Sequence, residues 1–378
     1  MWMRRFLIIG AVVVVAVAIS VALWAGQRLA DVPSLDVHTV PFPESDAGLV
    51  LADPSRLRIT FLGATTLLFD DGETAFLTDG FFSRPSFSEV VLSPLEPDIE
   101  EIARVLERLG VERLEAVIPL HAHYDHAMDA SSVAELTEAR VIGSESVTNV
   151  ARGHPLPERQ IQLIEDGETI ALGRFRLTFI ESLHAPGDRA PGVITEPLKS
   201  PSHATRFRTG TVYSMLVEHE GRRVLVHSSA GFLPGNLADH QADVVYLSIG
   251  DLGTQGASYR EAYWDEVVAA VGARRVVLTH WDNLFLRLDD RLQPAPRLYQ
   301  DHKPAMESLY ALKLRDGVEL RLRGCSSRPI RSSACPTNRR RMRTKTTSNR
   351  SASRCRTCAT ANSGWATTPW PIHRLTSR

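Results

Sequence analysis

Residues 1–324 of this 378-residue chain contain no cysteine, because all four cysteines lie in the segment 325–378. The larger part therefore has no disulfide framework, and its cysteine usage does not report its redox compartment. The segment 325–378 in turn lacks acidic side chains and carries 12 Lys or Arg. The remainder carries 31 basic and 44 acidic side chains, which makes it a poor general binder of nucleic acid, since phosphate contacts need Lys and Arg.

The segment 325–378 also lacks periodic apolar positions and is rich in Arg, Ser and Thr. It cannot bury enough surface to offset the entropy of ordering it, so we expect a basic disordered tail that is dispensable for folding. The abrupt change of composition also fits a frame-shifted end. The alternative is a zinc knuckle, although nine residues between its first two cysteines is poor spacing for zinc. Its ligands would be Cys325, Cys335, Cys355 and Cys358.

Charged residues are absent from the long apolar run Phe6 to Trp24, which directly follows Arg4 and Arg5. At about 1.5 Å rise per residue, this run nearly spans a hydrocarbon core of roughly 30 Å. We expect an uncleaved membrane anchor over residues 1–25, with the two arginines in the cytoplasm and the rest of the chain on the extracytoplasmic side. A cleaved signal peptide and a buried helix are the alternatives. A signal has a shorter apolar region, and Leu23-Trp24-Ala25 is a poor cleavage site.

Residues 26–56 carry Pro, Asp and Ser without periodicity, which predicts a linker, and the body follows from 57 to 324. Alternating and short buried apolar runs predict strands at Leu57–Leu62, Thr65–Phe69, Thr74–Asp79, Ala116–Leu120, Arg140–Gly143, Phe175–Ser182, Val212–His219, Arg223–His227, Val244–Ile249, Arg275–Thr279 and Val318–Leu322. Helical spacing predicts helices at Ile99–Leu109, Ala130–Thr137, Glu145–Arg152, Tyr259–Val271 and Pro304–Leu314. Two rounds of strands followed by helices indicate two sheets face to face with helices outside.

The strongest signal in the sequence is the run His121-x-His123-x-Asp125-His126, which places four metal-capable side chains close together. In an extended segment His121 and His123 point the same way, and a turn after them brings Asp125 and His126 around a second point. Such a loop can supply two imidazoles to one metal, and an imidazole and a carboxylate to a neighbour about 3.5–4 Å away. Imidazole with carboxylate suits zinc, and also iron or manganese.

This run resembles the HxHxDH signature of the metallo-beta-lactamase superfamily, and the resemblance covers about 57–323. Within the superfamily it is most similar to the lactonase-like branch, which includes ascorbate-6-phosphate lactonases and N-acyl-phosphatidylethanolamine phospholipase D. Phe61-Leu62-Gly63-x-x-Thr66 and Leu77-Thr78-Asp79 resemble the opening strands of that branch, and Thr279-His280-Trp281-Asp282 resembles its closing element. The resemblance implies an α+β fold, a four-layer αββα sandwich with the metals at one edge.

The resemblance also implies two sets of three metal ligands, one for each metal. The first set is His121, His123 and His184, the last of which follows the strand Phe175–Ser182. The second set is Asp125, His126 and His280, the last of which follows the strand Arg275–Thr279. Asp125 would hold both the second metal and the nucleophile, which makes it the expected catalytic residue.

The sequence departs from the superfamily at Ala230, where an Asp that bridges the two metals is usual. Ala cannot bind a metal, so we expect a second metal that is weaker or is completed by water or another carboxylate. Asp251 and Asp282 are candidates for that carboxylate, and each is equally well explained as a solvated turn residue. His227 is a candidate replacement ligand, against the plainer interpretation of a polar residue at a strand end.

Three further features lie near these motifs. Asp79 ends a strand, and it either orients a metal-ligating His or forms a turn. The long segment Ala185–Thr209 directly follows His184 and is expected to form one wall of the substrate site. Aromatic side chains close to the metal motifs supply either apolar substrate contacts or core packing; these are Phe81, Phe82 and Tyr124.

Together these features predict a metal-dependent hydrolase with one or two zinc ions, with iron or manganese as alternatives. A metal-bound water has a pKa lowered to about 7 and supplies hydroxide, which attacks an ester, lactone, amide or phosphodiester bond. The expected substrate is a small molecule or a lipid, the membrane is contacted through the N-terminal helix, and nucleic acid is not a partner. The alternative is a non-hydrolytic or redox metal-binding member of the same fold, which the loss of the bridging Asp at Ala230 would fit.

Overall fold

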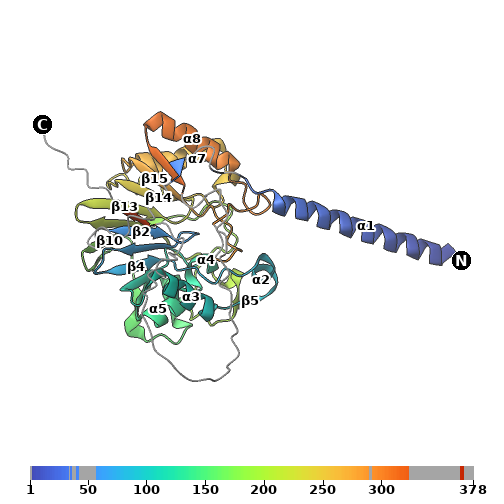
Figure 1. The fold of residues 1–378 in the computed structure, drawn as a ribbon, viewed down its shortest axis with the longest axis horizontal. Coiled ribbons are helices and arrows are strands. Elements are labelled where there is room, and N and C mark those ends of the chain that lie inside the picture. The colour runs from blue at the N-terminus through green and yellow to red at the C-terminus, as the bar shows by residue number, and fades with distance from the viewer. Residues whose placement is uncertain are drawn as a thin grey trace, which may run out of the picture. The chain divides into compact units, whose positions relative to one another are not determined.

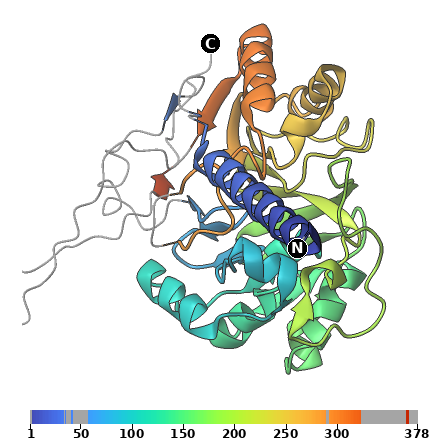
Figure 2. The same ribbon diagram turned by 90° about the vertical axis from the view of Figure 1, so that its right-hand side faces the viewer.

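The computed structural model describes residues 2–33, 35, 40–41, 57–288, 292–322 and 367–369. Within these residues the strands form two large sheets (Figures 1 and 2). The first sheet has the order β17 (Thr367–Pro369), β2 (Arg58–Phe61), β3 (Leu67–Asp70), β4 (Ala75–Thr78), β6 (Ala116–Ile118), β7 (Arg140–Gly143) and β8 (Ile161–Leu163). The second has the order β1 (Val40–Pro41), β16 (Glu319–Leu322), β15 (Arg275–Thr279), β14 (Val244–Ser248), β13 (Arg222–His227), β12 (Val212–His219), β10 (Phe175–Ser182) and β9 (Thr169–Leu172).

Both sheets combine antiparallel pairs with parallel strands. In the first sheet β2, β3 and β4 are antiparallel, whereas β4, β6, β7 and β8 are parallel. In the second sheet β9, β10, β12 and β13 are antiparallel, and β13 to β16 are parallel. A parallel strand needs a crossover. Helices lie in each of these crossovers except the one from β13 to β14, where residues 228–243 form turns without a helix. Two-residue strands, β5 (Pro94–Leu95) and β11 (Ser202–His203), form a separate pair.

Helices cover the outer face of each sheet (Figure 1). The first sheet is covered by α3 (Ile99–Leu109), α5 (Ala130–Thr137) and α6 (Glu145–Arg152), and the second by α7 (Ala257–Trp264) and α8 (Lys303–Asp316). A π-helical turn, Asp265–Ala269, extends α7, and two short helices are α2 (Phe87–Leu92) and α4 (Tyr124–Ala127). The expected four-layer αββα sandwich is confirmed.

The core has two parts because successive side chains of a strand point to opposite faces. In β4, Phe76 faces the second sheet and meets Phe175 edge-on with ring centroids 5.1 Å apart. Its neighbour Leu77 faces the helices and belongs to a separate cluster that includes Ile102 of α3 and Val133 of α5. Both sheets are thus buried on two faces, which fixes the register of the strands whose ends carry the site.

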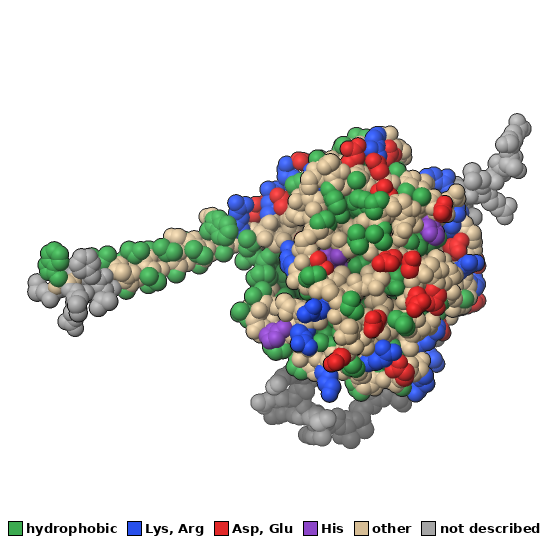
Figure 3. Space-filling model, turned by 180° about the vertical axis from the view of Figure 1, so that it is seen from behind, with side chains coloured by type: hydrophobic (Ala, Val, Ile, Leu, Met, Phe, Trp, Pro, Cys, Tyr) green, Lys and Arg blue, Asp and Glu red, His purple; other side chains and the backbone are tan. Residues whose placement is uncertain are grey.

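The N-terminal run forms α1 (Trp2–Ala30), and its segment Ile9–Ala30 is long and apolar enough to cross a membrane, as a signal sequence also is. None of that segment is buried, so the alternative of a buried helix is wrong. Figure 3 shows hydrophobic side chains along it.

The expected linker is partly structured. Gly26–Ala30 continue α1, Leu35 is buried in the core, and Val40–Pro41 form a strand parallel to β16. Residues 31–33 are in neither a helix nor a strand, and linker residues 34, 36–39 and 42–56 lie outside the described residues.

One short part of the tail differs from the expectation that none of it continues the sandwich. Thr367–Pro369 pair with β2 in antiparallel register at the edge of the first sheet. The rest of the tail, with the four cysteines of the zinc-knuckle alternative, lies outside the described residues.

Candidate metal centre

The site residues follow strand ends at the same edge of the sandwich. His121 and His123 lie in the loop after β6, and Asp125 and His126 lie in the single turn of α4. From the second sheet, His184 comes two residues after β10 and His280 comes directly after β15. Strand ends of this kind are where side chains from distant parts of an α/β chain converge.

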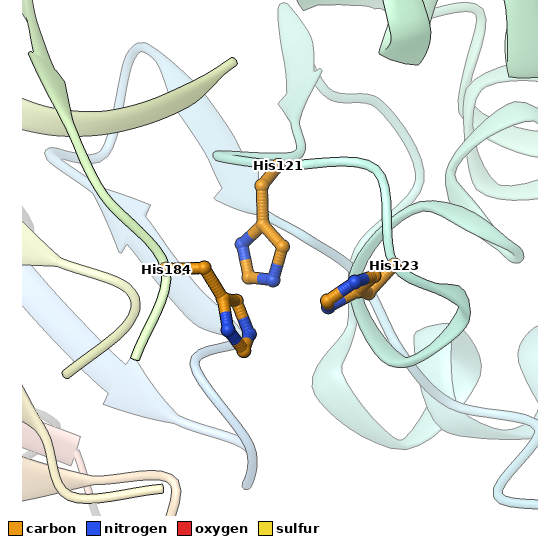
Figure 4. A group of neighbouring side chains, drawn as sticks. All are labelled: His121, His123 and His184. Atoms are coloured by element: carbon orange, nitrogen blue, oxygen red, sulfur yellow. The ribbon is translucent and has the colours of Figure 1, made fainter. Parts of the chain in front are cut away.

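The first cluster consists of His121, His123 and His184, whose ligand atoms lie within 4.8 Å of one another. Their rings converge on one point (Figure 4), with centroids 5.0 Å apart for His121 and His123, and 4.6 Å apart for His123 and His184. His184 Nδ1 donates to the Ala185 carbonyl at 3.0 Å, which leaves its Nε2 for a ligand.

The second cluster consists of Asp125, His126 and His280, whose ligand atoms also lie within 4.8 Å of one another. Asp125 Oδ2 is 3.3 Å from His280 Nε2 and 3.6 Å from His126 Nε2. The two clusters adjoin, because the ring centroids of His121 and His126 are 3.8 Å apart. The structure therefore brings together all six side chains that the sequence assigned to two metals.

Asp79 contacts His126, which agrees with the first of its two interpretations, that it orients a histidine of the site. Its Oδ2 is 2.9 Å from His126 Nδ1, it accepts a hydrogen bond from Thr65, and both its own and the histidine side chain are buried. This contact makes Nδ1 the protonated nitrogen of His126 and leaves Nε2 facing Asp125. A carboxylate on the far nitrogen of a histidine is the usual outer partner at a metal site.

His123 has a similar partner that the sequence did not reveal. Its Nε2 is 3.1 Å from Asp188 Oδ1 and 3.0 Å from Thr209 Oγ1, and Thr209 also hydrogen-bonds to Asp188. Burial raises the pKa of the Asp188 carboxyl, but the hydrogen bonds from His123 and Thr209 lower it by more, so this pKa lies below its usual range. The anionic Asp188 accepts from Nε2 and leaves His123 Nδ1 for a ligand. Asp188 and Thr209 belong to the segment expected to form a wall of the site.

Replacing either carboxylate by its amide is expected to weaken metal binding about 10–100-fold, because the histidine loses its orienting anion. Asp188→Asn should act on the cluster that contains His123, and Asp79→Asn on the cluster that contains His126. Chelator competition followed by metal analysis measures both. The exposed Asp239 supplies a matched control, Asp239→Asn. Equal metal affinity in Asp188→Asn and Asp239→Asn would show that Asp188 does not orient His123.

The charge state of the clusters fits a cation. Burial lowers the pKa of the His121 imidazole well below its usual range, and nearby His126 acts the same way, so this ring is neutral. Its Nε2 is buried without a hydrogen-bond partner. Burial likewise lowers the pKa of His184 to about 4. Burial raises the pKa of the Asp125 carboxyl, but His126 and His280 lower it by more, so Asp125 is a carboxylate. An orphaned imidazole nitrogen beside neutral rings and an anion matches the donor set of zinc or iron.

The residues near the missing bridging Asp do not replace it. Ala230 is buried, and a Cβ on its neighbour Gly231 would lie 2.3 Å from the His184 carbonyl oxygen, so this turn packs against the first cluster. The two ring nitrogens of His227 are 2.8 Å from Ser214 Oγ and 2.7 Å from the Gly231 carbonyl oxygen. His227 is thus fully engaged, which agrees with the plainer interpretation of it.

The two candidate carboxylates have other partners. Asp251 pairs with Arg189 at 3.3 Å and belongs to neither cluster. Asp282 Oδ2 is 2.7 Å from Arg84 Nη1, and its Oδ1 accepts from the Ala64 backbone at 2.8 Å. The interpretation of Asp282 as a solvated turn residue is therefore wrong, because its side chain is buried and both its oxygens are bonded inside the protein. Asp282 also belongs to neither cluster. The same turn contains His280, whose backbone N–H donates to the Ala64 carbonyl oxygen.

His302 is a buried residue that no sequence pattern singled out. Neither of its ring nitrogens has a hydrogen-bond partner, and burial lowers its pKa to about 4. The nearby His280 lowers that pKa further. His302 directly precedes α8, and only the fold places it near the end of β15.

Comparisons with known proteins agree with this geometry. The family model described as the beta-lactamase superfamily domain matches residues 74–281. A UPF0173 metal-dependent hydrolase of Pyrobaculum aerophilum is 29% identical over 237 residues, which are 62% of this chain and 88% of the relative. A relative of the same name from Rhizobium leguminosarum is 28% identical over 222 residues, 58% of this chain and 80% of that one.

Solved structures give weaker likenesses. Igni18, a metallo hydrolase from Ignicoccus hospitalis, is 16% identical with a TM-score of 0.45, over 70% of this chain and 94% of that one. CmlA, a diiron beta-hydroxylase from Streptomyces venezuelae, is 16% identical with a TM-score of 0.43, over 71% and 53%. Likeness at this level bears on neither substrate nor metal.

The site and the matched model define a class of protein. The chain belongs to the metallo-beta-lactamase superfamily, since the model covers more than half of its residues. Within that class it is a metal-dependent hydrolase, as its curated relatives are.

Proposed function

We propose that this hydrolase cleaves an ester, lactone, amide or phosphodiester bond with one or two zinc ions held by the two clusters. The observation that carries the proposal is the pair of adjoining three-residue clusters at one edge of the sandwich. Iron or manganese also suits imidazole with carboxylate, so the choice of metal follows from availability as well as from ligands. The proposed ligands are His121, His123 and His184 for the first ion, and Asp125, His126 and His280 for the second.

The chain's own residues prepare the reaction. A divalent metal, when bound, lowers the pKa of water and stabilises developing negative charge on the substrate. Asp125 lies between His126 and His280 as a buried carboxylate, so it can accept a proton from the nucleophile and hold its orientation. Asp79 and Asp188 fix the tautomers of their histidines, which sets the geometry before substrate binds.

We infer unequal metal sites. Ala230 supplies no anionic ligand, and no carboxylate among the described residues joins both clusters in its place. The second ion should therefore be lost first. Ala230→Asp is expected to raise the affinity for the second ion by at least the roughly 10-fold that an outer partner of a metal ligand contributes. Ala230→Asn, which has the same shape without the charge, should not. Chelator titration with metal analysis decides, and two equally tight ions in the unchanged protein would contradict the inference.

The substrate wall favours an apolar group. Leu183, directly before His184, is 47% exposed, and Val193 in the segment Ala185–Thr209 is 52% exposed. One of these aliphatic side chains directly precedes a proposed metal ligand and the other belongs to the expected wall segment, which suits a substrate that has an acyl or lipid part next to its scissile bond. We therefore propose a small-molecule or lipid substrate, as in the lactonase-like branch that the sequence resembles.

We further propose that α1 is an uncleaved membrane anchor with the body on the extracytoplasmic side. Trp2 and Trp24 lie at the two ends of its apolar run, and the Arg28 guanidinium lies 5.8 Å from the Trp24 ring. Aromatic and basic residues at both ends of an apolar helix match the two interfaces of a bilayer.

A substrate panel tests the proposed activity. The full chain, loaded with zinc, iron or manganese in separate samples, is assayed on chromogenic esters, lactones, amides and phosphodiesters. Hydrolysis of one class, lost with chelator and in Asp125→Asn, is the expected result. Metal binding without turnover on any class, together with oxygen consumption in the iron sample, would favour the redox alternative.

A further inference from the structure

The short helix α2 presents an apolar surface. Phe87, Val91 and Leu92 are 46%, 57% and 75% exposed, and no residue of α2 is buried. Leu298, from the loop before α8, is 39% exposed and directly precedes Tyr299, whose ring stacks on Phe87. We call these four residues the α2 patch. A group of apolar side chains exposed to solvent is typical of a surface that binds a partner or a membrane.

The α2 patch is held in place from both sides. The Phe87 ring stacks on Tyr299 at 4.8 Å and meets Phe285 edge-on at 5.4 Å, and those two rings are 4.9 Å apart. At the helix start, Ser86 and Glu89 form a capping box, which occupies the carboxylate of the one charged residue in α2. The surface is therefore preformed.

A chain of contacts joins the α2 patch to the end of α1. Asp31 directly follows α1, and its carbonyl accepts from the Arg297 N–H at 3.1 Å. The side chains of the same two residues lie 3.5 Å apart. Tyr299, which stacks on Phe87, is only two residues further, a span of at most about 7 Å. The α2 patch thus lies beside the point where the chain leaves α1.

We propose that the α2 patch docks on the lipid bilayer that α1 crosses. The inference rests on the proposed membrane anchor, because a bilayer spanned by Ile9–Ala30 has its surface at Asp31. Apolar residues at that level enter the boundary between headgroups and acyl chains. The position of the α2 patch beside the end of α1 favours the bilayer over a second copy of the chain, because a protein partner could bind a patch anywhere on the surface. Docking would fix the orientation of the body on the membrane and would bring lipid-phase substrates to the site.

Photocrosslinking of the full chain tests this docking. The photoreactive residue p-benzoylphenylalanine replaces Leu92 in one variant and Leu314 in a matched control, a leucine on α8 that is 63% exposed. A third variant carries it at Val13, inside α1. Each chain is reconstituted in phosphatidylcholine vesicles and irradiated, and adducts are identified by mass spectrometry. We expect adducts with a single phosphatidylcholine molecule at positions 13 and 92, and no lipid adduct at position 314.

Each other outcome overturns a defined part of the account. Lipid adducts at 13 but not at 92 would overturn the docking and leave the anchor intact. Absence of adducts at 13 would overturn the anchor, and the docking with it, without touching the hydrolase assignment. Crosslinks at 92 to a second copy of the chain would overturn the docking by showing that the α2 patch is a protein interface.

Discussion

His184→Ala is expected to empty the first metal site and to lower turnover by more than the roughly 100-fold that loss of an outer partner costs. The reason is that, of the three proposed ligands in that cluster, only His184 comes from the second sheet. The two histidines that remain, His121 and His123, both come from one loop, so the metal would have no protein ligand from the second sheet. His121→Ala and His123→Ala should have the same effect. Mass spectrometry of the metal content, with turnover on the substrate found in the panel, measures it.

The matched control is His203→Ala, which removes an exposed histidine of β11 that belongs to neither cluster. It should keep full metal and full activity. Thermal melting of each variant separates loss of a ligand from loss of the fold. If His184→Ala keeps its metal and its turnover, the third ligand has been misassigned.

Asp282→Ala is expected to lower the free energy of unfolding by about 3–5 kcal/mol, because it leaves the buried Arg84 guanidinium without its partner. The exposed fractions of the two side chains are 1% for Arg84 and 0% for Asp282, and their atoms are 2.7 Å apart. Gly63 packs tightly here, since a Cβ on it would lie 2.0 Å from Arg84 Nη2. Chemical denaturation measures the loss.

The double variant Arg84→Met with Asp282→Leu serves as the control, since replacing a buried ion pair by apolar residues costs much less than breaking it. It should recover most of the lost stability. Metal content should remain in Asp282→Ala below its melting temperature, because Asp282 is bonded to Arg84 and Ala64 and belongs to neither cluster. Loss of metal with an unchanged free energy of unfolding would instead make Asp282 a ligand.

The body could be predicted from the sequence because its elements have clear apolar periods. The helices Ile99–Leu109 and Ala130–Thr137 and the strands Phe175–Ser182 and Arg275–Thr279 have the predicted bounds. The first of these helices combines a regular period with a turn residue at its end, Gly110 in a left-handed conformation. The elements that were missed are short: α2 has six residues and none of them is buried, so it has no core-facing period.

The candidate site divides in the same way. Its six predicted ligands follow strand ends, where the order of elements decides which side chains meet. The outer partner Asp188 could not be predicted, because it lies in a long segment whose path back to His123 depends on tertiary contacts. Arg84 is 198 residues from Asp282 along the chain, so no local pattern links them. What remains a prediction is the role of the six as metal ligands.

Anomalous diffraction at metal absorption edges, from crystals of the purified protein, tests that role most directly. One peak is expected within bonding distance of the histidines of the first cluster. A second, weaker peak is expected among Asp125, His126 and His280, and the absorption edge identifies the metal. If crystals of catalytically active protein show no peak at either cluster, or a single peak elsewhere in the molecule, the six side chains are not the metal ligands.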